Sequence, residues 1–264
     1  MITKIKEDLN KVFDKYQDKL WYVKVSGCSY GDPYEYDAKR YDWSNENIYV
    51  GSKNDVEKVI INTSAKYILN CAAITDIEYC ENNKDKCLNV NTFAVNCIES
   101  VCKKYNKKLI HITSDYALNP VNYYGFTKYL NEKQLDKSKS LIIRTSFYSK
   151  QLYLVRELLN HKEVTAYTNV FFNPVSINRL AKEIFKKRNK YGILNVFSNS
   201  KVSKYEFAIQ ICKTFGINTN LVKPAKFKNT KGSARRPFNS FVNTEIKINT
   251  LRDLKHFKFF TLKS

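Results

Sequence analysis

The sequence predicts an α/β fold, with a doubly wound parallel sheet and a smaller C-terminal α/β part. Short apolar runs of strand length alternate with segments whose apolar residues recur at helical spacing. This alternation is typical of βαβ units, in which the strands run parallel and the crossovers are right-handed. In addition, small and polar residues follow several of the apolar runs. Ligands bind at that edge of a parallel sheet, so the same pattern predicts where a site should lie.

Composition and charge limit the classes of protein to consider. The chain has 264 residues, of which 43% are hydrophobic, enough for one full core or for a large domain plus a small one. No apolar run approaches the roughly 18 residues of a membrane span, and no signal peptide is recognisable, so we expect a cytoplasmic protein without membrane contact. The net charge of +20 raises nucleic-acid binding as a hypothesis. The lysines are dispersed and no nucleic-acid motif is present, so we expect none; a basic cleft would also suit a pyrophosphate-bearing substrate.

The cysteines indicate neither a metal site nor a disulfide framework. They number seven, and none forms a Cys-x-x-Cys pair. The spacings of the four cysteines between Cys80 and Cys102 match no common zinc pattern, and the three histidines are scattered. We therefore expect free, buried thiols and no metal.

The first fifty residues contain an additional helix and a candidate phosphate loop. Within residues 1–20, apolar side chains recur in steps of three and four, which predicts an amphipathic helix that packs on its own sheet or forms an oligomer contact, such as a homodimer. Residues 21–26 form the first expected strand. Gly27 follows it, at the point where a glycine-containing turn lets a cofactor pyrophosphate approach the backbone. The further glycines of a dinucleotide-binding fingerprint are absent.

Small residues follow the next buried strand. A strand ending at Asn70 is followed by Ala72 and Ala73, where a cofactor could lie close to the backbone; tight core packing is the alternative interpretation. The elements expected in this region are a strand at 48–50, a helix over 53–64, a strand at 66–70 and a long helix over 84–105.

The segment from His111 to Glu132 carries the clearest chemistry. An apolar strand over 109–112 leads to Ser114, and the helix that follows has Tyr124 in its first turn and Lys128 one turn later. Residues four apart share one helix face. A lysine there can lower the pKa of the phenol, a serine can hydrogen-bond a reacting oxygen, and the tyrosine can donate a proton to it. The Tyr-x-x-x-Lys spacing also occurs at Tyr129, where we interpret it as a surface helix pair.

The last third of the chain resembles a substrate-binding part. A strand over 141–144 precedes Phe147, which either faces a substrate or belongs to the core. Ser176 is expected to cap a helix. The elements expected after it are a strand at 192–198 and a helix that begins with a capping box, Ser203 and Glu206, and ends at Gly216.

Several of these motifs resemble one family. The runs are Asn70-Cys71-Ala72-Ala73, Thr113-Ser114-Asp115-Tyr116, Tyr124-Gly125-Phe126-Thr127-Lys128, Arg144-Thr145-Ser146-Phe147 and Ala234-Arg235-Arg236-Pro237. They are similar to the dTDP-4-dehydrorhamnose reductase branch of the extended short-chain dehydrogenase/reductases, over about residues 21–254. The resemblance implies a Rossmann-like domain over 21–147 and a smaller substrate-binding region over 148–264.

The resemblance also implies roles for individual residues. It implies that Ser114, Tyr124 and Lys128 are catalytic, and that NADPH or NADH is the cofactor, with Lys53 favouring NADPH. The cofactor contacts that it implies are Gly27, Ser29, Gly31, Ala72, Ala73 and Lys128. The implied substrate is a nucleotide sugar, with contacts from Thr75, Ser114, Phe147, Asn173 and Arg236; the arginine either pairs with phosphates or holds its loop.

The chain departs from the family pattern at two places. Nine residues separate Ser114 from Tyr124, where the family has a longer loop that borders the substrate, so altered substrate contacts are expected. The glycine pattern after the first strand is also incomplete. These departures keep a second hypothesis open, a non-catalytic binding subunit like the regulatory subunit of methionine adenosyltransferase, which belongs to the same branch. Fold alone does not decide between the two hypotheses.

Overall fold

A computed structural model describes the backbone of residues 22–27, 40–41 and 53–261, and side chains from residue 53 to residue 258. The helix expected within residues 1–20, the strand expected at 48–50, and the loop positions Ser29 and Gly31 lie outside the described residues.

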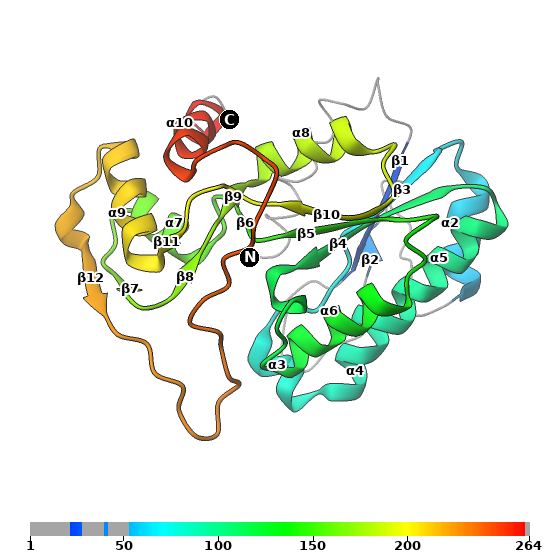
Figure 1. Ribbon diagram of the computed structural model, residues 1–264, viewed down its shortest axis with the longest axis horizontal. Helices are drawn as coiled ribbons and strands as arrows, with labels where there is room; N and C mark the ends of the chain where they lie inside the picture. Colours follow the sequence, from blue (N-terminus) through cyan, green and yellow to red (C-terminus); the bar gives the residue numbers. More distant parts are fainter. Residues whose placement is uncertain (1–21, 28–39, 42–52, 262–264) are drawn as a thin grey trace.

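The larger part of the protein is built on a six-stranded sheet with the order β10-β5-β4-β3-β1-β2 (Figure 1). All neighbouring strands are parallel except β2, which runs antiparallel to β1. The strands are β1 Tyr22–Gly27, β2 Arg40–Tyr41, β3 Tyr67–Asn70, β4 Lys108–Ser114, β5 Leu141–Thr145 and β10 Gly192–Val196. The predicted α/β class with a parallel sheet is confirmed.

Helices cover both faces of this sheet, as the apolar residues on both faces require. On one face, α2 (Lys53–Asn62) and α5 (Ala94–Lys104) enclose a core that includes Ile98 and Leu109. On the other face, α8 (Ile177–Lys187) packs over a second core. Figure 1 shows α5 and α6 below the sheet and α8 above it. This two-sided cover explains why the strands are continuous apolar runs instead of alternating patterns.

The long helix expected over 84–105 is present, but it contains a wide turn. It consists of α4 (Lys84–Leu88), a π-helical turn (Asn89–Phe93) and α5. Within the wide turn, Asn91 is fully buried; its side chain accepts from the backbone N–H of Ile74 at 2.8 Å and donates to the carbonyl of Ile74 at 3.0 Å. These bonds tie the helix to the segment after β3, and π-type turns of this kind occur frequently at functional sites.

A C-terminal lobe, residues 148–176 and 197–261, has its own apolar core. Tyr148 lies at its centre, with edge-on contacts to the rings of Phe207 and Phe257. Its helices are α7 Tyr153–Leu159, α9 Lys204–Phe215 and α10 Thr250–Thr261; its short strands are β6 Phe147–Tyr148, β7 Val164–Tyr167, β8 Phe171–Phe172, β9 Val175–Ser176, β11 Val202–Ser203 and β12 Val222–Ala225. Between these segments the chain returns to the large sheet through α8 and β10. A boundary at residue 147 therefore does not divide the chain into two continuous parts. β10 comes after that residue in the sequence, but it pairs with β5 in the large sheet.

The helix signals predicted for the last third of the chain are confirmed. The hydroxyl of Ser176 caps α8 by accepting from the N–H of Arg179 at 3.2 Å. Ser203 and Glu206 form the reciprocal capping box of α9, with bonds of 3.0 and 2.7 Å. Gly216 ends this helix with a φ of 75°, a conformation that favours glycine because it has no Cβ.

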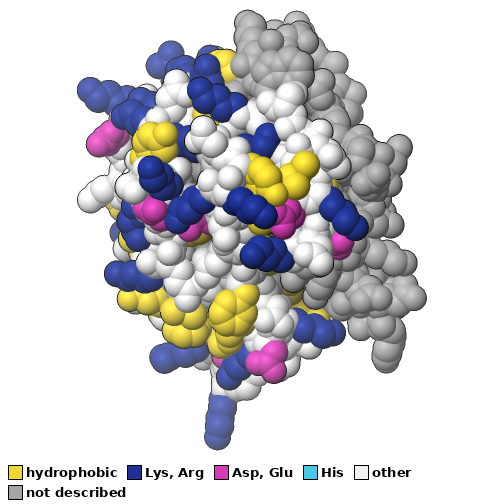
Figure 2. Space-filling model, turned by 90° about the vertical axis from the view of Figure 1, so that its right-hand side faces the viewer, with side chains coloured by type: hydrophobic (Ala, Val, Ile, Leu, Met, Phe, Trp, Pro, Cys, Tyr) yellow, Lys and Arg dark blue, Asp and Glu magenta, His cyan; other side chains and the backbone are white. Residues whose placement is uncertain are grey.

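The surface drawn in Figure 2 carries positive charges over much of its described part. Lys and Arg side chains are spread there among acidic, polar and apolar ones. Among the described residues, no helix combines the length and the apolar character that a membrane crossing requires.

Candidate active site

Ser114 and Tyr124 are brought together by a compact connection between β4 and α6. Ser114 ends β4, and Tyr124 is the second residue of α6 (Tyr123–Gln134). Asn122 caps α6, because its Oδ1 accepts from the N–H of Gly125 at 2.9 Å. A Cβ at Gly125 would lie 2.9 Å from the carbonyl oxygen of Tyr116. Glycine at this position therefore lets the first turn of the helix lie directly on the short connection.

The candidate proton donor is buried beside the serine. The exposed fractions of Ser114 and Tyr124 are 8% and 9%. Ser114 Oγ donates to Asp115 Oδ1 at 2.8 Å and accepts from the N–H of Tyr116 at 3.3 Å. Burial raises the pKa of Tyr124, and a hydrogen bond with Ser114 opposes the rise. The pKa therefore moves opposite to the sequence-based expectation that a lysine lowers it, because loss of hydration is the largest cause and the charge of Asp115 adds to the rise.

Lys128 lies on the same helix face as Tyr124, one turn further. It is 2% exposed, and its ammonium lies 6.0 Å from the centroid of the Tyr124 ring. Burial lowers the pKa of Lys128 to about 8, against the opposing charge of Glu132. A buried ammonium whose charge is this costly favours a partner that brings hydroxyl or anionic oxygens.

The pH dependence of stability tests the burial of this ammonium. We expect the free energy of unfolding of the wild type to rise, relative to Lys128→Met, from about pH 8 to the ordinary lysine pKa of 10.5. Across that window the unfolded chain binds the extra proton, so stability increases with pH, by about 1.4 kcal/mol for each unit of pKa difference. Urea unfolding at a series of pH values measures it. Lys133→Met, on the exposed side of the same helix, is the control; parallel curves for wild type and Lys128→Met would contradict the assignment.

The turn after β3 is held by a hydrogen-bonded asparagine and histidine. Asn70 Oδ1 accepts from the N–H of Ala72 at 2.9 Å, so its amide nitrogen faces His111 Nδ1 at 3.1 Å. This geometry assigns the His111 proton to Nε2. Burial, followed by the charge of Lys128, lowers the pKa of His111, so the ring is neutral. His111 is the first residue of the segment that the sequence analysis singles out. Its connection to the turn at Ala72 could not be predicted, because it depends on the pairing of β3 with β4.

The expected cofactor positions lie at one edge of the sheet. Val25 is in register with Asn70; Gly27 ends β1 two residues later, and Ala72 follows the end of β3 by two residues. Ser114 ends the next strand and is in register with Thr145. The convergence of motifs at the carboxyl edge of the sheet, inferred from the sequence, is thus found in the described strands. Ala73 follows Ala72 and is half-buried.

The expected substrate contacts are placed less uniformly. Thr75 is exposed, and Phe147 is half-buried against the core under α8. Arg236 is half-buried and forms an ion pair with Glu78 at 3.4 Å. The other carboxylate oxygen of Glu78 accepts from the N–H of Ala234 at 2.9 Å. Of the two interpretations of Arg236, the structure thus supports loop anchoring directly.

The side chain of Asn173 is buried and hydrogen-bonded within the protein. It is fully buried, and its amide donates to the carbonyls of Ser198 and Val242 at 2.7 and 2.8 Å. Its Oδ1 accepts from the N–H of Val242 at 3.1 Å. In this structure the side chain of Asn173 joins two backbone segments, and its contact with substrate stays a prediction.

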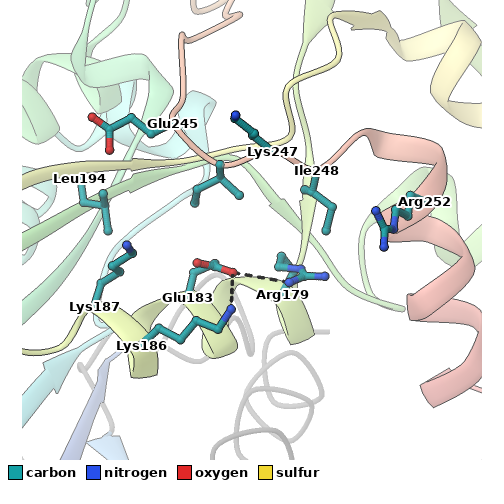
Figure 3. A pocket seen from close by; sticks show the side chains of 10 residues that line it. Arg179, Glu183, Lys186, Lys187, Leu194, Glu245, Lys247, Ile248 and Arg252 are labelled. Atoms are coloured by element: carbon teal, nitrogen blue, oxygen red, sulfur yellow. Dashed lines mark hydrogen bonds and ion pairs between the residues drawn. The ribbon is translucent and has the colours of Figure 1, made fainter.

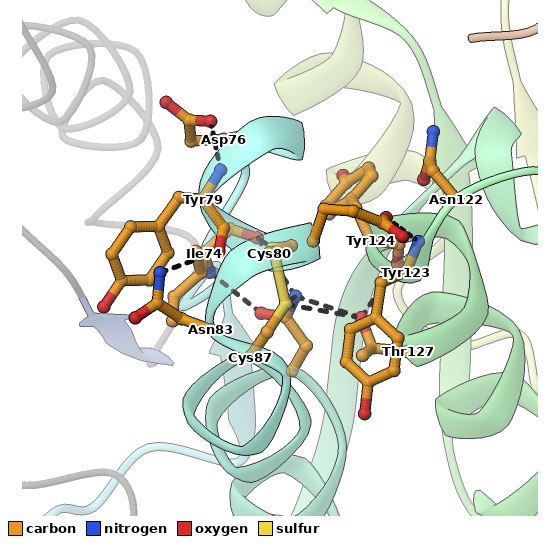
Figure 4. The surroundings of a disulfide bond; sticks show 12 residues. Ile74, Asp76, Tyr79, Cys80, Asn83, Cys87, Asn122, Tyr123, Tyr124 and Thr127 are labelled. Atoms are coloured by element: carbon orange, nitrogen blue, oxygen red, sulfur yellow. Dashed lines mark hydrogen bonds between the residues drawn. A yellow bond between two sulfur atoms is a disulfide. The ribbon is translucent and has the colours of Figure 1, made fainter. Parts of the chain in front are cut away.

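The expectation of free thiols is wrong for two of the cysteines. Cys80 and Cys87 form a disulfide with a Cα–Cα distance of 5.4 Å, whereas the thiols of Cys97, Cys102 and Cys212 are free. The helix break between α3 (Ile77–Asn82) and α4 brings the pair together, which spacing alone did not reveal. Figure 4 shows the disulfide beside Tyr124 and Thr127, and both sulfurs lie in the apolar cluster that contains Tyr124.

A cavity of about 440 Å³ lies between α8 and residues 245–252. Its wall is mainly charged; within it, Glu183 forms ion pairs with Arg179 at 3.5 Å and with Lys186 at 3.7 Å (Figure 3). None of its lining residues is among the site residues that the sequence predicts. The candidate chemistry is therefore not located in this cavity.

The geometry agrees with what comparison with known proteins finds. Residues 36–259 match the family described as RmlD substrate binding domain, which is more than half of the chain. The dTDP-4-dehydrorhamnose reductase of Escherichia coli K12 is 23% identical, over 89% of this chain and 89% of that protein. The methionine adenosyltransferase 2 subunit beta of Bos taurus is 23% identical, over 87% of this chain and 75% of that protein.

Solved structures show the same fold. The dTDP-4-dehydrorhamnose reductase of Bacillus anthracis, a complex with NADP, superimposes with a TM-score of 0.74 at 20% identity, and the match covers 96% of this chain and 95% of that one. The match to solved structures and the family match point to the same family. This chain belongs to the RmlD substrate binding domain family, the family of the dTDP-4-dehydrorhamnose reductases.

Proposed function

We propose that the protein is an NAD(P)H-dependent reductase of a nucleotide-activated 4-keto-6-deoxysugar, acting in deoxysugar biosynthesis. The observation that carries the proposal is the position of Tyr124. Its phenol is buried beside Ser114, and the ammonium of Lys128 lies one helical turn further, at the edge of the sheet where ligands bind. Membership of a family that contains sugar-nucleotide reductases supports it.

The residues at this edge fit a dinucleotide. The small side chains of Ala72 and Ala73 leave the backbone approachable, and the buried ammonium of Lys128 suits the hydroxyls of a ribose. A bound reduced nicotinamide would supply the hydride. Lys53, the first residue of α2, favours NADPH over NADH because its charge suits an additional phosphate.

In the proposed reaction, each side chain of the site has a separate role. The raised pKa of Tyr124 keeps the phenol protonated at neutral pH, which is the state that a proton donor needs. Ser114 orients the ketone oxygen toward that phenol. Lys128 holds the ribose and places a positive charge near the phenolate that remains after proton transfer. Phe147 and Arg236 are proposed to border the sugar and the phosphates; for Arg236 this requires exchange of Glu78 for a phosphate.

Titration with NADPH and NADH tests the proposal first. We expect micromolar binding of at least one of them, measured by calorimetry, and oxidation of the bound cofactor when keto-sugar nucleotides of the dTDP type are added. Binding should weaken in Lys128→Met and remain unchanged in Lys133→Met. If a folded sample binds neither cofactor at millimolar concentration, the reductase proposal is wrong.

A second candidate function is that of a binding subunit without its own turnover. The similarity to methionine adenosyltransferase 2 subunit beta favours it. The intact Ser114, Tyr124 and Lys128 arrangement opposes it. A subunit that only binds a partner does not need a buried tyrosine with a serine and a lysine beside it. Cofactor binding without oxidation by any keto-sugar nucleotide would favour this second function.

A further inference from the structure

The cavity between α8 and residues 245–252 has an apolar side and a basic side. Leu194 of β10, Ile246 and Ile248 form the apolar side, and Figure 3 shows Leu194 and Ile248 across the cavity from α8. The other lining residues are charged, and five of all ten are lysine or arginine. A volume of about 440 Å³ and a mixed lining are typical of sites for small molecules.

The two helices that border the cavity are joined behind its lining. Asp253 of α10 is fully buried and is not itself a lining residue; its Oδ1 accepts from the hydroxyl of Ser176, directly before α8, at 2.9 Å. Asn249 caps α10, because its Oδ1 accepts from the N–H of Arg252 at 2.7 Å. The starts of α8 and α10 are thus held next to each other, with Arg179 and Arg252 in their first turns.

Both arginines stand where a helix disfavours a cation. The amino end of a helix carries a partial positive charge, so lysine and arginine are favoured in the last turn and not in the first. Arg179 is the third residue of α8, whose first turn has no acidic residue, and Arg252 is the third residue of α10. An anion between them would be attracted by both guanidinium groups and by the two helix ends that carry them.

The carboxylates of the cavity compensate only part of its positive charge. Glu183 is 7% exposed, and it forms ion pairs with Arg179 and Lys186. Lys187 and Arg252 form no ion pair with any residue that the structure describes. Figure 3 shows these two side chains at opposite ends of the cavity, with Glu183 between them. The cavity therefore keeps uncompensated cations beside an apolar wall.

This lining specifies the chemistry of a ligand. Arginine binds phosphate through two parallel hydrogen bonds, and it does so best where no carboxylate of the protein already occupies it. The apolar wall suits a flat ring that has little need of water. A mononucleotide combines a phosphate with such a ring, and it is small enough to be enclosed here, whereas an extended acidic peptide is not.

We propose that this cavity is a binding site for a mononucleotide, with the phosphate between Arg179 and Arg252 and the base against Leu194, Ile246 and Ile248. The site is separate from the candidate active site, because the two share no residue. The inference goes beyond the proposed reductase function and does not rest on it.

Calorimetric titration of the full chain tests the site, with AMP, adenosine and inorganic phosphate as probes and NADPH present in excess. We expect AMP to bind with one site per chain, and more tightly than either adenosine or phosphate. Arg252→Met removes a charge-assisted hydrogen bond and should weaken AMP binding on the order of 10-fold or more, and Arg252→Lys should recover part of the loss. Circular dichroism checks that each variant is folded.

Lys182→Met is the matched control, because Lys182 is an exposed residue of α8 that does not line the cavity. It should leave AMP binding unchanged. The inference is overturned if AMP does not bind at millimolar concentration, if Arg252→Met binds it like wild type, or if Lys182→Met loses as much affinity as Arg252→Met. If phosphate binds as tightly as AMP, the assignment to a mononucleotide is wrong. Absence of NADPH binding would count against the proposed function alone, since the Arg252 variants decide this site independently.

Discussion

Replacement of Tyr124 by phenylalanine should reduce turnover by roughly 10²–10⁴-fold, the usual contribution of a well-placed general acid. The variant removes the hydroxyl that, in the proposed mechanism, donates a proton to the ketone oxygen. The ring itself is retained, with its edge-on contact to Tyr116 at 5.7 Å between centroids. Steady-state kinetics of cofactor oxidation measures the loss, and circular dichroism and cofactor titration check that fold and binding persist.

Tyr129→Phe provides the control on the same helix. Tyr129 is half-buried, and Lys133 lies 5.3 Å from the centroid of its ring, which is the surface helix pair that the sequence suggests for this second copy of the spacing. Its replacement should leave kcat unchanged. Equal activity of Tyr124→Phe and wild type would remove Tyr124 from the mechanism.

The largest loss of stability is expected for Glu132→Ala. Glu132 is 3% exposed and receives a two-pronged set of hydrogen bonds from the Arg144 guanidinium, at 2.6 to 3.0 Å. This pair joins α6 to β5. Removal of one partner leaves the other charge without compensation in a poorly hydrated site, so the free energy of unfolding should fall by about 3–5 kcal/mol, measured by urea unfolding.

Two comparisons separate the charge effect from lost packing. Replacement of both Glu132 and Arg144 by methionine should recover much of the loss, because it removes both charges and retains volume. Lys104→Ala, which breaks the exposed ion pair with Glu57, should leave stability almost unchanged. A loss in Glu132→Ala no larger than in Lys104→Ala would show that the buried pair contributes little.

Local signals in the sequence predicted most elements, because their causes are local. The capping box at Ser203 and the end of the helix at Gly216 depend on neighbouring backbone groups alone, and both were found as predicted. The apolar strands and the carboxyl-edge position of Ser114 were also predicted, since strand patterns and the rules of parallel sheets specify them. The wide turn in the helix over 84–105 was not predicted, because it depends on the bonds of Asn91 to Ile74, seventeen residues away.

The candidate site was predicted only in part, for a comparable reason. Spacing placed Tyr124 and Lys128 on one face, but the direction of the Tyr124 pKa depends on burial that spacing does not reveal. Asn173 was expected at the substrate, and in this structure it is fully bonded to Ser198 and Val242. The Cys80–Cys87 disulfide depends on the break between α3 and α4.

The sequence by itself determined the order of strands and helices, and the resemblance to one family of reductases. It also placed Ser114 at the end of β4, with Tyr124 and Lys128 on the helix that follows. These features follow from residue type and short-range spacing. Only the tertiary structure decided which charged groups interact: Arg144 pairs with the buried Glu132, Arg236 pairs with Glu78, and the charge of Lys128 acts on the buried ring of His111. Such groups are far apart along the chain, and their energies depend on how much water the fold removes around them.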